Sequence, residues 1–188
     1  MNKQIFYFFA LCLSVSVAIT SCNPDDTPPP NPQEVINYLT YTLTPVGGGD
    51  AVVLTWDDPD GDGTGETTVA PLQANTAYNA VVGLQNTTVD PAEDVIAEDI
   101  GQELEEHQFF FTTTVDGMIV DYNPLDIDAE GNPVGIASEV ETADAGTGNL
   151  TIILRHEPDK NGEGVSDGDI TNAGGETDIE VTFEISVE

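Results

Sequence analysis

The sequence predicts an all-β domain: an antiparallel β-sandwich of about eight strands with at most one short helix. Short runs rich in β-branched and aromatic residues recur along the chain, and Gly, Asp, Asn and Pro, which favour turns, separate them. Long helical patterns that alternate with strands, which would predict a parallel sheet, do not occur. Many short strands joined by turns are therefore the simplest interpretation.

The strand candidates follow one another from residue 39 onward. Residues 39–45 alternate with a period of two, and the glycine-rich stretch 47–50 separates them from 51–56, which predicts a hairpin. Residues 93–106 show one apolar stripe, but the segment is short, acidic and interrupted by glycine, so we expect a turn or two of helix, or a loop. The further strand candidates are 66–70, 77–84, 108–115, 118–122, 150–156 and 178–187.

The first 21 residues have the architecture of a secretory signal peptide, and a cysteine follows them. Lys3 precedes the apolar run 5–18, which is too short to span a membrane stably, and Ile-Thr-Ser leads to Cys22. This motif resembles the lipobox of bacterial lipoproteins, which implies cleavage after residue 21 and acylation of Cys22. The chain would then be anchored in outer-membrane lipid. An ordinary signal peptide with an incidental cysteine is the alternative.

Residues 22–34 are predicted to be the lipidated cysteine and a proline-rich tether, followed by a single sandwich domain over 35–188. Five prolines lie within 23–34, and such a density favours an extended chain. Asp25 and Asp26 resemble the acidic export signal of Bacteroidota lipoproteins. That resemblance implies display on the outer face of the outer membrane.

The composition restricts the partners. The chain carries 35 acidic residues against three Lys and Arg, a formal net charge of −32. Such a surface repels nucleic acid, so we expect no nucleic-acid partner, and it attracts divalent cations or basic protein surfaces. Cys12 lies in the signal and Cys22 at the anchor, so the folded domain has no thiol for a disulfide, a zinc–thiolate site or a nucleophile.

Two resemblances refine the fold. Residues 72–78 resemble the tyrosine-corner segment of fibronectin type III and other immunoglobulin-like domains, in which a tyrosine hydroxyl bonds back to the chain upstream. This implies an immunoglobulin-like sandwich with Tyr78 in that role, and an ordinary half-buried strand tyrosine is the alternative. Several stretches also resemble small acidic lipoproteins of the Bacteroidota, mainly Flavobacteriia: 43–62, 105–112, 148–158 and 174–183. Some members are labelled as having a type 1 periplasmic-binding fold, which needs long helices that this chain lacks.

Residues 58–63 have the pattern D-x-D-x-D-G that opens calcium loops. Asp58, Asp60 and Asp62 would converge on one Ca²⁺, and Glu66 stands at the ninth position. The twelfth position is Val69 instead of a bidentate glutamate, so we expect weak binding, with a Kd of ~10⁻⁴–10⁻³ M. Weaker echoes of the pattern are 126–131 and 159–164. Asp and Gly also form ordinary turns, which is the alternative.

The two histidines of the chain suggest a different metal site. His107 opens a predicted strand just after Glu106, and His156 closes another just before Glu157. Imidazoles among carboxylates could bind Zn²⁺ or Cu²⁺ if the strands bring them together, with Glu106 and Glu157 as supporting acids. Haem beside the aromatic run 109–111 is a further option, although such a run also fits a core and its reverse face. Histidines at acidic strand ends are also ordinary surface features.

No catalytic motif is present. The chain lacks G-x-S-x-G, H-E-x-x-H and a phosphate loop, so we expect no enzyme. The sequence predicts a lipid-anchored binding or accessory module of the outer membrane that captures a metal ion or metal complex beside a TonB-dependent receptor. The alternative is a structural or adhesive surface lipoprotein with calcium-stiffened acidic loops.

Overall fold

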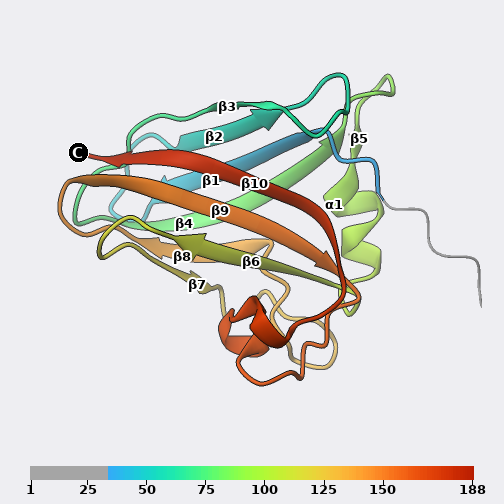
Figure 1. Cartoon of the computed structure of the whole chain (residues 1–188). Helices are drawn as coiled ribbons and strands as arrows, with labels where there is room; N and C mark the ends of the chain where they lie inside the picture. Colours follow the sequence, from blue (N-terminus) through green and yellow to red (C-terminus); the bar gives the residue numbers. More distant parts are fainter. Residues whose placement is uncertain (1–33) are drawn as a thin grey trace, which may run out of the picture. The chain divides into compact units, whose positions relative to one another are not determined.

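The computed structural model describes residues 34–188. The signal peptide, the acylation of Cys22 and the tether up to residue 33 lie outside the described residues. Residues 34–188 form two antiparallel sheets packed face to face, with α1 as a short helix at one end (Figure 1). The predicted all-β sandwich is confirmed. Within this described part, no helix has the length and apolar character needed to cross a membrane.

The larger sheet has seven strands, in the order β3-β2-β1-β4-β8-β7, with β5 paired to β4. Its strands are β1 Tyr38–Pro45, β2 Val52–Asp57, β3 Glu66–Thr68, β4 Ala77–Asn86, β5 Glu93–Asp94, β7 Ile119–Tyr122 and β8 Ala137–Glu141. The helix α1 (Val95–Glu98) and the 3₁₀ turn η1 (Ile100–Gln102) follow β5, as the predicted turn or two of helix. Each predicted strand matches an observed one, whereas β5 and β8 were not predicted.

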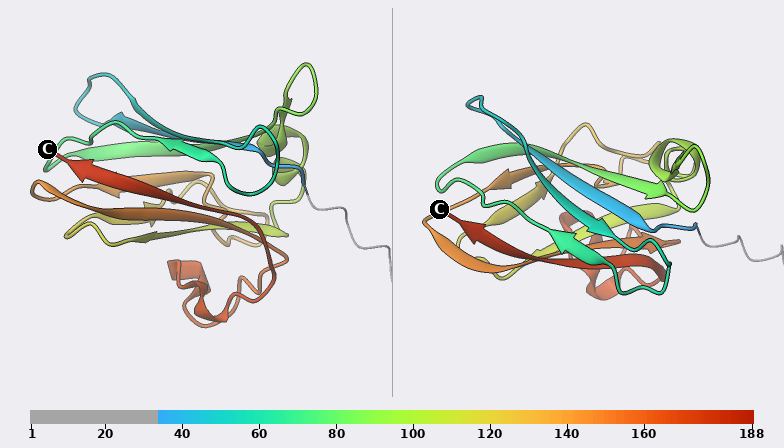
Figure 2. Two further views of the ribbon diagram at one scale, coloured as in Figure 1. Left: turned by 45° about the horizontal axis from the view of Figure 1, so that its top comes forward. Right: turned by 90° about the horizontal axis from the view of Figure 1, so that it is seen from above.

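The smaller sheet has the order β10-β9-β6. Its strands are β6 His107–Thr113, β9 Gly146–His156 and β10 Glu176–Val187. The connection from β9 to β10 carries two 3₁₀ turns, η2 (Val165–Asp167) and η3 (Ile170–Asn172). It folds against the smaller sheet on the side away from the larger one (Figure 2). There Val165 and Ala173 pack on Phe110 and Ile153 as a second, small core.

The main core fills the space between the sheets, because alternate side chains of each strand point inward. In the aromatic run, Phe109 is buried in this core, Phe110 in the second core, and Phe111 packs partly buried against the first. The aromatic run thus packs on the main core with one face of the strand and on the second core with the other, as the alternative interpretation of the sequence predicted. The Tyr78 hydroxyl accepts a 2.8 Å hydrogen bond from the Gln73 backbone N–H, five residues upstream.

Candidate metal centre

Strand pairing brings the two histidines together. His107 begins β6, His156 ends β9, and the two residues are directly paired in the antiparallel ladder. His107 has the same strand parity as Phe109, and His156 the same as Leu154, so both belong to the face that packs on the main core. Their rings lie 4.6 Å apart, centroid to centroid, and are perpendicular. The predicted approach of the two imidazoles therefore occurs in the structure.

Two carboxylates complete the group, and they are Glu34 and Asp178. His107 Nε2 lies 3.5 Å from Glu34 Oε1 and 3.9 Å from Asp178 Oδ2. His156 Nδ1 lies 3.8 Å from each of the same two oxygens. One donor atom from each residue lies within 4.8 Å of all the others. We call Glu34, His107, His156 and Asp178 the His–acid cluster.

The backbone explains how Asp178 reaches the cluster. Thr177 pairs with Arg155 and Ile179 with Leu154, so Asp178 is the extra residue of a β-bulge in β10. A bulge re-aims a side chain, which lets Asp178 turn inward although Ile179 beside it is also buried. Just before β10, a Cβ on Gly175 would lie 2.2 Å from the carbonyl oxygen of His156. Glycine at 175 thus permits the close approach of β10 to the end of β9.

Glu34 comes from the segment that leads into β1 of the larger sheet, whereas the other three residues belong to the smaller sheet. β6 and β10 begin and β9 ends at the same end of the sandwich, where the described chain also starts (Figure 1). The sequence places Glu34 in the predicted tether. In the structure its side chain is 5% exposed and faces both histidines.

Most of the polar side-chain atoms of the cluster are buried and lack hydrogen bonds. The side chains of His107 and Asp178 are 0% exposed, and that of His156 is 13% exposed. Among residues 34–188, eight buried side-chain nitrogen and oxygen atoms have no hydrogen-bond partner, and five of them belong to this cluster: Glu34 Oε2, His107 Nε2, His156 Nδ1 and both carboxylate oxygens of Asp178. Such a concentration of unpaired polar atoms is costly unless a ligand satisfies them.

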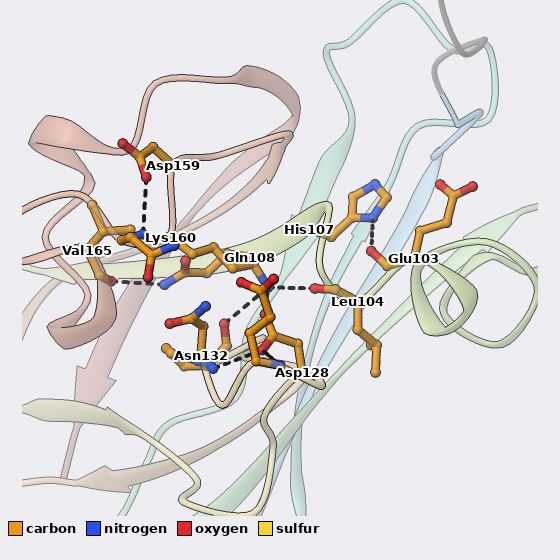
Figure 3. A network of polar contacts seen from close by, with 12 residues as sticks. Glu103, Leu104, His107, Gln108, Asp128, Asn132, Asp159, Lys160 and Val165 are labelled. Carbon is orange, nitrogen blue, oxygen red and sulfur yellow. Dashed lines mark hydrogen bonds and ion pairs between the residues drawn. The ribbon is translucent and has the colours of Figure 1, made fainter.

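A hydrogen bond orients His107. Its Nδ1 lies 3.0 Å from the carbonyl oxygen of Glu103 (Figure 3). A carbonyl only accepts, so Nδ1 carries a proton in this hydrogen bond, and Nε2 is the ring nitrogen that faces the two carboxylates. Histidine ligands of metals characteristically donate their other ring N–H in this way.

The distances fit a bound ion better than direct ion pairs. Hydrogen bonds between an imidazolium and a carboxylate are usually about 2.7–2.9 Å long, and the four distances here are 3.5–3.9 Å. Ligands around a tetrahedral Zn²⁺, at bonds of about 2.0–2.2 Å, lie about 3.4 Å from one another. The four histidine–carboxylate distances exceed this spacing by about 0.1–0.5 Å, and all donor atoms of the cluster lie within 4.8 Å of one another. Two nitrogens and two oxygens suit Zn²⁺ or Cu²⁺ better than Ca²⁺.

The other predicted site residues lie elsewhere. Glu106 and Glu157 are exposed and form a second grouping with His156, separate from Glu34 and Asp178. Asp58, Asp60 and Asp62 have donor atoms within 4.8 Å of one another in the loop between β2 and β3, and Glu66 begins β3 beside them.

In the loop 126–131, which weakly matches the calcium-loop pattern, the ammonium group of Lys160 lies where a metal ion would be expected. Lys160 is 5% exposed, and its Nζ donates to Asp128 Oδ2 at 3.0 Å and to the carbonyls of Leu104 at 2.5 Å and Pro133 at 3.5 Å (Figure 3). The other oxygen, Asp128 Oδ1, accepts from the backbone N–H of Asn132. Burial raises the pKa of Asp128, but these hydrogen bonds and Lys160 together hold it below its usual value. The loop is thus stabilised by a cation of the chain itself.

Asp178 makes the stability of the metal-free protein depend on pH. Burial, and then the charge of Glu34, raises the pKa of Asp178 to about 6, although both histidines lower it. The unfolded chain loses this proton near pH 3.9, so between about pH 4 and 6 only the folded state holds it. The free energy of unfolding should therefore fall as pH rises through this window, by roughly 3 kcal/mol for this group. The free energy of unfolding can be measured by urea denaturation at several pH values with a chelator present. Between about pH 4 and 6 it should depend less on pH in Asp178→Asn than in the wild type. An unchanged pH dependence would contradict the raised pKa of Asp178.

In comparisons with known proteins, no family, curated protein or solved structure matches this chain.

Proposed function

We propose that this protein is a metal-binding module whose His–acid cluster holds one transition-metal ion, with Zn²⁺ as the best fit. The observation that carries the proposal is the convergence of two imidazole nitrogens and two carboxylates on one point. Both nitrogens, both Asp178 oxygens and one Glu34 oxygen are buried without hydrogen bonds. Two neutral imidazoles and two carboxylates sum to a charge of about −2, which a divalent cation neutralises.

The closed geometry favours a resident ion over a cargo that is passed on. Structural zinc sites have four protein ligands, whereas sites that exchange or catalyse keep a position open. Here the most exposed of the four side chains, His156, is 13% exposed. The ion would join the smaller sheet to the segment before β1 of the larger one. Antibody domains use a disulfide between their sheets, but residues 34–188 contain no cysteine.

The proposed setting is the cell envelope. The lipobox-like motif at Cys22 supports a lipid anchor in the outer membrane, and Asp25 and Asp26 support display at the surface. There the domain would act as a binding or accessory module, and a TonB-dependent receptor is the partner we propose. Capture of a metal ion for that receptor is the second candidate function, favoured by the partial exposure of His156.

Metal analysis tests the proposal. The full chain, purified in mild detergent without added metal or chelator, should contain about one zinc per chain by plasma mass spectrometry. Stripping the ion should lower Tm by roughly 10 °C, because saturating ligand adds about 4 kcal/mol at a thousandfold excess over Kd. Zn²⁺ should restore the Tm, and Ca²⁺ should not.

Isotope exchange separates the two functions. A resident ion should exchange with free ⁶⁵Zn over hours, and a transported one within minutes. Substoichiometric metal together with a Tm indifferent to chelator and Zn²⁺ would refute both.

A further inference from the structure

We infer that the loop between β2 and β3 is a second cation site, specific for a hard divalent ion such as Ca²⁺ and independent of the His–acid cluster. Asp58, Asp60 and Asp62 bring their donor atoms within 4.8 Å of one another. Exposed acids often cluster without a ligand, so the inference depends on what distinguishes Asp58 from the other two.

Asp58 is buried, and one of its oxygens is unsatisfied. The residue is 2% exposed, whereas Asp60 and Asp62 are exposed. Its Oδ2 accepts a 2.8 Å hydrogen bond from the Gly63 backbone N–H at the far end of the loop, which directs the carboxylate into the loop. Its Oδ1 has no hydrogen-bond partner. A buried carboxylate oxygen left in this state requires a cation or another donor.

The chemistry of the loop selects the type of ion. The side-chain donors are all oxygens and mainly carboxylates, including Glu66, which lines the same hollow as Asp58 and Asp60. Oxygen donors of this kind suit Ca²⁺, whereas the imidazoles of the His–acid cluster suit zinc. The positive charge that would balance these carboxylates does not come from Arg155 or Lys160, the two basic residues of the described part. Arg155 donates to Thr177, and Lys160 donates to Asp128. With Val69 in place of a closing acid, the expected Kd is ~10⁻⁴–10⁻³ M.

The position of Trp56 provides a direct probe. Trp56 is the one tryptophan of the chain. A Cβ on Gly65 would lie within 3 Å of its Nε1, so the indole packs directly against the loop. Terbium, a hard cation that replaces Ca²⁺, should therefore emit by energy transfer when Trp56 is excited. Emission from this loop can be measured on the full, zinc-loaded protein, which keeps the His–acid cluster occupied.

The expected result is saturable terbium emission that Ca²⁺ displaces at roughly 0.1–1 mM. Asp58→Asn should weaken it at least tenfold, and so should Asp60→Asn, an exposed substitution that does not endanger folding. Asp50→Asn removes one charge from an exposed turn outside the loop and should leave it unchanged. Emission that is equal in all three variants, or that does not saturate, would overturn the inference. His107→Ala should not alter the signal, so failure of the zinc centre leaves this test intact.

Discussion

Replacing His107 with alanine should abolish stoichiometric zinc binding and lower zinc affinity at least about 100-fold. The loss of a residue that only orients a metal ligand already costs about 10–100-fold in metal affinity, and His107 is itself a proposed ligand. Its ring is fully buried, its Nδ1 is fixed by the Glu103 carbonyl, and its Nε2 has no other hydrogen-bond partner. Competition with a chromophoric chelator measures the affinity.

The matched controls for this prediction are the acids that the sequence favoured. Glu106→Gln and Glu157→Gln remove exposed carboxylates next to the two histidines and should leave zinc bound. Glu34→Gln should weaken binding strongly. Because alanine at 107 also leaves a cavity, the metal-free forms are compared separately by urea denaturation. Loss of zinc in Glu157→Gln with retention in Glu34→Gln would place the ion in the exposed grouping instead.

Replacing Lys160 with alanine should destabilise the protein by about 3–5 kcal/mol, which is roughly 10 °C in Tm. The substitution leaves the carboxylate of Asp128 buried without its cation and removes a donor from the carbonyls of Leu104 and Pro133. Lys160→Met keeps much of the side-chain volume and should still show most of the destabilisation expected for Lys160→Ala. Combining it with Asp128→Asn should restore a part, because the uncompensated charge is then gone.

Arg155→Ala serves as the control, since it removes the other cation of the described residues. Arg155 donates to the hydroxyl of Thr177 and has no carboxylate partner among residues 34–188, so we expect a loss below about 1 kcal/mol. Equal effects of the two substitutions would show that overall charge, and not the buried contact, determines stability.

The strands could be predicted because their period-two patterns are local. The exceptions are instructive. Strand β8 is Ala-Ser-Glu-Val-Glu, in which Val140 is the one large apolar residue, and a 2.7 Å bond between the hydroxyls of Ser138 and Tyr41 helps to hold it in the sheet. Strand β5 has two residues. Such elements form through tertiary contacts that no local pattern records.

The site was half predictable. The histidines stood out because there are two in the chain, but Glu34 and Asp178 were two acids among 35. Successive residues of a strand point to opposite faces, so an acid adjacent to a strand histidine was a poor candidate for its partner. Glu106 nevertheless has a donor atom within 4.8 Å of those of His156, on the neighbouring strand, and Glu157, so its predicted role stays a prediction. Nothing local, however, predicts the bulge that turns Asp178 inward, or the path that brings Glu34 beside β6.

Glu34 also determines how the domain would respond to mechanical load. It lies four residues before β1, and the described chain starts at the end of the sandwich opposite the C-terminus (Figure 1). A pull through the preceding chain reaches Glu34 before it reaches the hydrogen bonds of β1. With an ion bound, the force would pass through Glu34 into β6, β9 and β10 together, and β1 would not begin to peel until that coordination broke. Tension applied through the chain before Glu34 would thus be borne first by the proposed metal coordination.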